Sequence, residues 1–216
     1  MAHWGQPPWS APPYPQHHPH VYIPGPQYAN WWTHPEAYGG RPNPPPSVRS
    51  KQYPNLNPIL AADTTLLRFD IKRKPRTEIL ASTYYSNRNS PARASPFTHM
   101  RLISKSFPWT IDIVSPDNIT CEVVWDALYS ALQQPIVDSE WGFIVRDGEM
   151  KETVEKAVKK RLTADGGKGD KHYKRIDFLG DETIFKGLEK DDELEKAMVL
   201  PLSQGVTETW VVKLSS

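Results

Sequence analysis

Apolar and polar residues alternate in several short segments of the chain, which is the pattern of half-buried β-strands. In Trp109–Val114 and Thr209–Leu214 the large apolar side chains fall on every second residue. Met100–Phe107 precedes the first of these segments, and a tight turn near Ser104–Pro108 predicts that the two strands are neighbours. Thr64–Ile71 alternates in part and predicts an earlier strand, which ends in a charged, proline-containing stretch.

A hairpin is predicted farther along the chain. Arg175–Leu179 and Thr183–Leu188 flank Gly180-Asp181, and glycine supplies the positive φ that tight turns need. Residues 77–97 contain two asparagines and two prolines without sustained periodicity, so we interpret them as a long surface connection.

Three segments have the 3.6-residue spacing of amphipathic helices. The first begins after Thr120, a suitable N-cap, carries Val124, Leu128 and Leu132 on one stripe, and stops before Pro135. A short second helix is expected around Glu140–Ile144, capped by Asp138 or Ser139. The third helix is expected over residues 149–163 and is ended by Gly166-Gly167.

Strands before and after a group of helices indicate an α+β domain. We expect a mostly antiparallel sheet with about three helices packed on one face, in a single domain of residues 57–216. Residues 1–56 are expected to form a disordered arm, because 15 of the 22 prolines fall in the first 58 residues, interleaved with tryptophan, tyrosine and histidine. Such an arm is either an unselected tail or a segment for docking or self-association.

Composition excludes several classes of protein. No apolar run approaches the roughly 18 residues of a membrane helix, and the N-terminus lacks the pattern of a secretory signal. The single cysteine, Cys121, excludes an internal disulfide framework, so we expect an intracellular protein, cytoplasmic or nuclear. No phosphate-cradling glycine loop or nucleophile elbow is found, and we assign no cofactor and no metal site.

Seven segments follow one another along the predicted domain in a specific order: Leu67-Arg68-Phe69-Asp70, Met100-Arg101-Leu102, Phe107–Ile113, Ile119–Leu132, Arg175–Gly180, Phe185–Leu188 and Trp210–Leu214. In these segments the domain resembles a fungal family that is known only as a domain of unknown function, the one numbered 6699. The resemblance covers about residues 57–216 and implies a shared fold. It brings no activity and no catalytic residues.

Reactive side chains are few in the domain. Cys121 would lie in the first turn of the first predicted helix, where the helix dipole stabilises a thiolate. A nucleophilic cysteine also needs a base, and His99 and His172 are the only histidines of the domain. The alternative is a structural, buried cysteine.

Three aspartates each lie between two large apolar residues: Asp70, Asp112 and Asp177. If their strands are neighbours, alternation places the three carboxylates on one face, as in an acid/base or hard-metal site. The simpler interpretation is that they occupy the wet face of a half-exposed sheet.

Basic residues form two groups, one at Lys72–Arg76 and one that runs from Lys159, Lys160 and Arg161 to Arg175. Clustered cations can bind phosphates. Acidic residues interleave with the second group, and the predicted domain is close to neutral, so a solvated helix face is the simpler interpretation and nucleic acid is the third hypothesis.

The leading hypothesis is a non-enzymatic module that binds another protein, with the arm contributing docking or self-association. Trp125 and Tyr129 are the candidate contact residues, because both lie off the apolar stripe of the first predicted helix. For these two residues, the alternative is that the second predicted helix buries both side chains, which is the more common outcome for aromatic residues. The alternative is an enzyme of unrecognised type that uses the aspartates or Cys121 with a histidine.

Overall fold

The computed structural model describes residues 49–164, 166, 169–198 and 208–216. The chain divides into two units, Met1–Pro45 and Pro46–Ser216, and only the second contains described residues. The arm predicted for residues 1–56 therefore lies almost wholly outside the described residues. Its last residues already pack on the folded unit, since Ser50 Oγ donates to Asp63 Oδ1 at 2.6 Å and Leu56 is buried.

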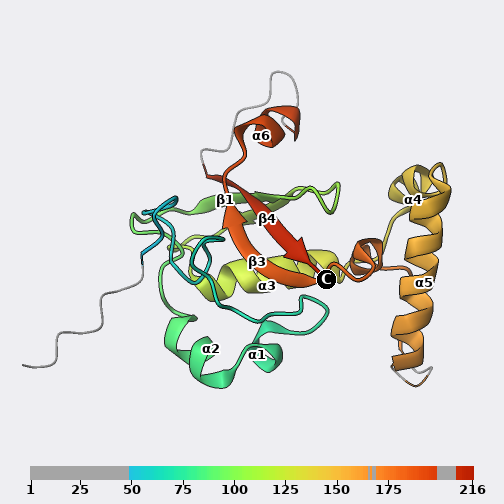
Figure 1. Cartoon of the computed structure of the whole chain (residues 1–216), viewed down its shortest axis with the longest axis horizontal. Coiled ribbons are helices and arrows are strands. Elements are labelled where there is room, and N and C mark those ends of the chain that lie inside the picture. The colour runs from blue at the N-terminus through green and yellow to red at the C-terminus, as the bar shows by residue number, and fades with distance from the viewer. Residues whose placement is uncertain (1–48, 165, 167–168, 199–207) are drawn as a thin grey trace, which may run out of the picture. The chain divides into compact units, whose positions relative to one another are not determined.

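A four-stranded sheet forms the centre of the second unit (Figure 1). Its strands are β1 (His99–Ile103), β2 (Ile111–Val114), β3 (Ile184–Glu189) and β4 (Thr209–Ser215), in the order β2-β1-β4-β3. Two ladders are antiparallel, β1 with β2 and β3 with β4, whereas β1 and β4 are parallel. The α+β prediction is confirmed, with a mixed sheet.

The last strand of the chain lies inside the sheet. Thr209, Trp210, Val211 and Val212 of β4 are all buried, whereas β2 alternates between buried and exposed residues. A strand with neighbours on both edges and apolar cover on both faces is expected to lose alternation in this way. The register of β3 with β4 shifts between Phe185 and Leu188, at Gly187, whose φ is +100°.

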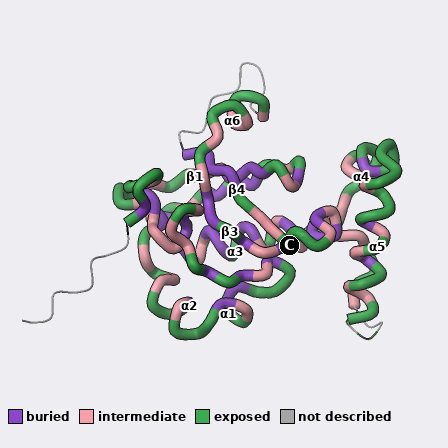
Figure 2. The backbone as a smooth tube through the Cα atoms, viewed as in Figure 1, coloured by how far each residue is buried: buried purple, intermediate pink, exposed green. Residues whose placement is uncertain are grey.

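Helix α3 (Cys121–Leu132) packs against β2 and is the helix that the apolar stripe predicted. Thr120 is its N-cap, and the Thr120 side chain accepts from the Val123 N–H. Figure 2 shows buried backbone concentrated in the sheet and along α3. The largest fully buried side chain in this core is Trp125, which lies 6.1 Å from Tyr84, ring centroid to ring centroid.

Two predicted strands are wrong. The 64–71 segment buries Leu67, Phe69 and Ile71 alternately, but it forms only an isolated bridge between Asp70 and Ile184. The hairpin at residues 175–188 is also wrong, because Arg175–Leu179 forms the 3₁₀ helix η1 and β3 pairs with β4 instead. Ile176 and Leu179 are buried three residues apart, which is the spacing of a 3₁₀ turn.

Three short helices were not predicted: α1 (Pro75–Glu78), α2 (Ala81–Asn87) and α6 (Asp192–Met198). The first two fall at and within the predicted surface connection of residues 77–97. Each is only one or two turns long, so the apolar period has too few repeats to be read from sequence.

The other two predicted helices form a helical pair. They are α4 (Asp138–Ile144) and α5 (Gly148–Ala164), and the N-cap of α4 is Val137 rather than Asp138 or Ser139. Ile144, Val154 and Val158 form their small buried core. Helix α5 contacts η1, and Phe178 of η1 packs against both this core and the main one.

Candidate functional site

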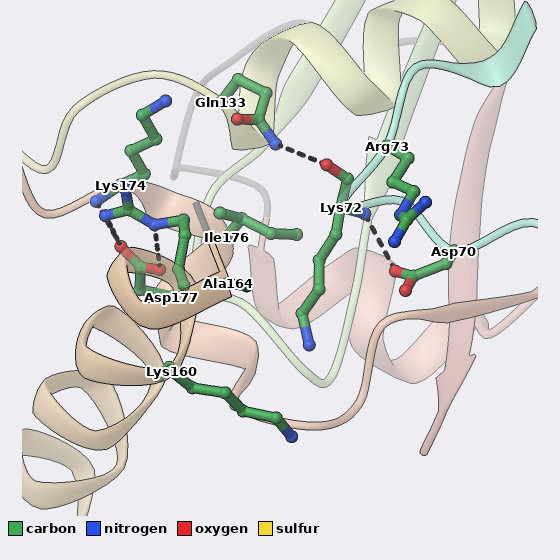
Figure 3. A pocket seen from close by; sticks show the side chains of 12 residues that line it. Asp70, Lys72, Arg73, Gln133, Lys160, Ala164, Lys174, Ile176 and Asp177 are labelled. Atoms are coloured by element: carbon green, nitrogen blue, oxygen red, sulfur yellow. Dashed lines mark hydrogen bonds and ion pairs between the residues drawn. The ribbon is translucent and has the colours of Figure 1, made fainter. Parts of the chain in front are cut away.

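A pocket of about 490 Å³ lies where α5 meets η1 (Figure 3). Its wall is built from four parts of the chain: the loop after Phe69, the end of α3, the second half of α5 and residues 174–180. Five cationic side chains line it with two carboxylates, Asp70 and Asp177. We call this the basic pocket; its cations are Lys72, Arg73, Lys160, Arg161 and Lys174.

Arg161 and Asp177 form the back of the basic pocket. The guanidinium meets the carboxylate with two hydrogen bonds of 2.9 and 2.8 Å, and Asp177 is only 3% exposed. The same guanidinium donates to the backbone oxygens of Asp170 and His172 at 2.6 and 2.8 Å. Asp177 also accepts from the Lys174 N–H at 2.8 Å. Arg161 therefore holds α5 on η1 and on the segment before it, rather than offering a free charge to a ligand.

Lys72 and Lys160 supply the accessible charge of the basic pocket. They extend from different elements toward the same open space (Figure 3). Lys160 Nζ lies 2.7 Å from Asp181 Oδ1, and both side chains are about two-thirds exposed, at 68% and 66%. The hydrogen bond from Lys160 lowers the pKa of Asp181, and the charges of Lys72 and Lys156 add to this effect. The Lys72 side chain has no ion pair with any described residue.

A carboxylate and a histidine flank the basic pocket. Asp170 accepts from the backbone N–H of His172 at 3.0 Å, and its Oδ1 lies 2.7 Å from His172 Nδ1. These two contacts lower the pKa of Asp170 to about 2. His172 is exposed, as is His99 on β1. Asp170 orients the His172 imidazole, but neither histidine has the buried setting of a general base.

The three predicted carboxylates do not form one cluster. Asp70 and Asp177 share the basic pocket, but Asp112 pairs with Arg101 across β1 and β2, with hydrogen bonds of 2.6 and 2.9 Å. These contacts lower the pKa of Asp112. The prediction of a shared sheet face is wrong because Asp177 lies in η1, not in a strand. In the described part of the chain, no group of three or more potential ligands could hold a metal ion.

Cys121 does begin α3, as predicted, but it is fully buried in the main core. Burial raises the pKa of the Cys121 thiol to about 12, which outweighs the effect of the helix start. The thiol is therefore protonated and covered at neutral pH. This finding contradicts the hypothesis of a nucleophilic cysteine and agrees with the structural alternative.

The predicted contact residues on α3 are not the exposed ones. Trp125 is 0% exposed, and its indole N–H has no hydrogen-bond partner among the described residues. Tyr129 is half-buried. Trp125 is therefore buried, which is the alternative to a contact residue, and the helices that cover that side of α3 are α1 and α2, which were not predicted.

Exposed apolar side chains gather instead around α4. Phe143 is 74% exposed, and Val137 and Val145 are also exposed at the ends of the helix. Beside them is a second pocket, of about 320 Å³, lined by Ile136, Asp138, Trp141 and Tyr173. We call this the aromatic pocket. Sequence reasoning missed it, although the aromatic residues of the Trp141-Gly142-Phe143 run were a readable signal.

The two basic groups of the sequence are brought together in part. Lys72 and Arg73 come from the first group, and Lys160, Arg161 and Lys174 from the second. Lys159 is exposed on α5 but does not line the pocket. The two groups can be seen in the sequence, whereas their convergence on one pocket depends on the packing of α5 against η1.

Residues 67–195 match the family of unknown function DUF6699, which is more than half of the chain. The chain belongs to this family. The matched range contains β1 to β3, α1 to α5, η1 and both pockets; it ends within α6 and does not include β4. Comparison of the DUF6699 chain with curated proteins gives no match, and neither does comparison with solved structures. No helix among the described residues is long and apolar enough to cross a membrane.

Proposed function

We propose that this DUF6699 domain is a non-enzymatic module that binds a partner protein, and that its basic pocket receives an anionic segment of that partner. The observation that carries the proposal is the excess of cations in the pocket wall, five against two carboxylates. A carboxylate or phosphate group there would meet Lys72 and Lys160 from two elements at once.

The cations of the basic pocket differ in how firmly other protein groups hold them, and this difference supports the proposal. Arg161 is engaged with the buried Asp177 and with two backbone oxygens, so it shapes the back wall. Lys160 is held only by an exposed ion pair, which contributes little and exchanges readily with another anion. Lys72 has no competing carboxylate within ion-pair distance among the described residues. The pocket thus combines a rigid wall with two adaptable lysines.

Catalysis lacks comparable support. The thiol is buried with a raised pKa, both domain histidines are exposed, and the three predicted aspartates are split between two places. A polar, open pocket whose charges are largely of one sign is more typical of recognition than of acid/base chemistry.

The test compares two double variants of the full-length protein with equal net charge. The probe is a fluorescein-labelled hexaglutamate peptide, followed by fluorescence anisotropy at low salt. We expect Lys72→Ala with Lys160→Ala to weaken binding about tenfold, the loss of two charge-assisted contacts. The matched control, Lys74→Ala with Lys159→Ala, removes two neighbouring lysines that do not line the pocket and should leave affinity within about twofold.

An equal loss of peptide affinity in the two double variants would contradict binding in the basic pocket, because it would show that the peptide is attracted by the overall charge of the protein. A single-stranded oligonucleotide is the second probe. If it bound more tightly than the peptide and lost affinity only in the pocket variant, the site would be reassigned to nucleic acid.

A further inference from the structure

The aromatic pocket has the chemistry of a site for proline-rich peptide. The rings of Trp141 and Tyr173 meet edge to face, with centroids 5.0 Å apart and planes at 68°. Ile136 adds an apolar wall, and Asp138 supplies a carboxylate. Pairs of aromatic rings that bound an open groove accept the flat, apolar pyrrolidine rings of proline.

The polar groups of this pocket are unused within the described residues. Neither the indole N–H of Trp141 nor the hydroxyl of Tyr173 makes a hydrogen bond with a described residue, and the Asp138 carboxylate makes no ion pair with one. A polyproline II segment has no internal hydrogen bonds, so its carbonyl oxygens are free to accept from such donors. A cation next to the prolines would complement Asp138.

The chain itself contains a segment with these properties. In residues 1–48 the only lysine or arginine is Arg41, and it is followed directly by Pro42-Asn43-Pro44-Pro45-Pro46. We propose that Arg41–Pro46 binds in the aromatic pocket, with the prolines against Trp141 and Tyr173 and Arg41 paired with Asp138. This inference concerns a different surface from the basic pocket and does not depend on the function proposed for that pocket.

The length of the chain shows which copy supplies the segment. Arg49 follows Pro46 by three positions, a distance along the chain of at most about 11 Å. The residues after Arg49 are fixed to the folded unit. Ser50 donates a hydrogen bond to Asp63, and the Tyr53 ring packs on Trp210 with ring centroids 5.6 Å apart. The described chain begins on the opposite side of the sheet from α4 (Figure 1). The segment in the pocket therefore comes from a second copy of the chain, and the protein self-associates.

The experiment is sedimentation velocity of the full-length protein between about 5 and 500 μM, a range that covers weak peptide-mediated association. We expect the sedimentation coefficient to rise with concentration. Arg41→Glu alone and Asp138→Lys alone should each weaken association about tenfold or more, because each brings like charges together. The two changes combined in one chain recreate an opposite-charge pair and should restore association to within about threefold of the wild type.

Matched variants separate this site from general effects. Arg49→Glu makes the same charge change eight residues later and should leave association unchanged. Tyr173→Phe keeps the ring and removes only the unused hydroxyl, so it should weaken association with little effect on the melting temperature. Lys72→Ala with Lys160→Ala should self-associate like the wild type, whatever its effect on peptide binding.

A protein that stays monomeric at every concentration would overturn the proposal. Failure of the combined charge reversal to restore association, with the variant folded by circular dichroism, would also overturn it. An equal effect of Arg49→Glu and Arg41→Glu would assign the attraction to net charge instead of to the aromatic pocket.

Discussion

The sheet with α3 and the α4–α5 pair are stabilised in different ways. The first encloses a large core in which Phe69, Trp125 and Phe185 are completely buried. The second buries three apolar side chains, Ile144, Val154 and Val158, among the described residues. Phe178 packs on both cores, and two ion pairs also join the helical pair to the rest of the unit: Arg161 with Asp177, and Arg175 with Glu140 at 2.5 Å.

The difference explains where the candidate sites lie. A helical pair with so little buried apolar area leaves aromatic and aliphatic side chains partly uncovered, and the charged groups that anchor it stay near the surface. Both the basic pocket and the aromatic pocket are lined in part by this region. The large core supports the fold, and the α4–α5 region contributes charged and aromatic side chains to both pockets.

The largest expected loss of stability comes from a substitution in the main core. Trp125→Ala removes a fully buried indole and should lower the free energy of unfolding by about 3–5 kcal/mol, because the cavity cannot collapse completely. Urea denaturation followed by circular dichroism measures this loss. Phe143→Ala on α4 is the control, and we expect a change within about 0.5 kcal/mol because that ring is exposed. Similar losses in both variants would show that the two regions do not differ as proposed.

The next effect tests the polar anchor of α5. Arg161→Leu leaves the buried Asp177 carboxylate without its cation and should lower the free energy of unfolding by about 3 kcal/mol. Hydrogen exchange should rise first in α5 and in residues 170–177, and later in β1 and β4.

Arg101→Leu is the matched comparison for this anchor. Its partner, Asp112, is also held by two hydrogen bonds but is 42% exposed, so the loss should stay below about 1 kcal/mol. If Arg161→Leu lowered the free energy of unfolding no more than Arg101→Leu does, the Arg161–Asp177 pair would not be an anchor for α5.

The smallest expected effect concerns Cys121. The pKa of the buried thiol, about 12, lies above its ordinary value of 9.0, so the native thiol stays protonated when the unfolded chain ionises. Its contribution to stability is complete below pH 9 and is lost as the pH rises toward 12. Cys121→Ser should cost about 2 kcal/mol at pH 7 by burying a hydroxyl, and the gap should narrow above pH 9.

Urea denaturation at pH 7 and pH 10 measures this difference. Tyr84, whose pKa burial also raises to about 12, ionises equally in both proteins and cancels in the comparison. Rapid reaction of the native thiol with a disulfide reagent at pH 8 would contradict the buried state and revive the nucleophile hypothesis.

Local sequence patterns were sufficient to predict those helices and strands whose caps, apolar stripes or turns lie within a few residues of one another. Helix α3 has an N-cap, an apolar stripe and a terminating proline, and all three agree. Only residues 104–110 separate β1 from β2, so contact between the two strands is local, although this connection is longer than the tight turn that was predicted. Thr209–Leu214 was recognised as a strand, but its place between β1 and β3 depends on partners far away in the chain.

The candidate site shows the same division. The sequence marked Asp70, Lys160, Arg161 and Asp177 as separate candidates, but it could not show that they face one pocket. Arg175–Leu179 was expected to be a strand, because alternation and a 3₁₀ turn both fit five residues. Arg161 and the Lys174 N–H engage Asp177, and these contacts favour the 3₁₀ helix.

The sequence by itself determined the α+β class, helix α3, the β1–β2 pair and the family, since each follows from residues close together or from a specific order of residues. Only the tertiary structure decided that Trp125 and Cys121 are buried and that cations from two distant groups converge. The physical reason is that burial and the pairing of charges depend on which elements pack together, and apolar contacts carry little information about the partner.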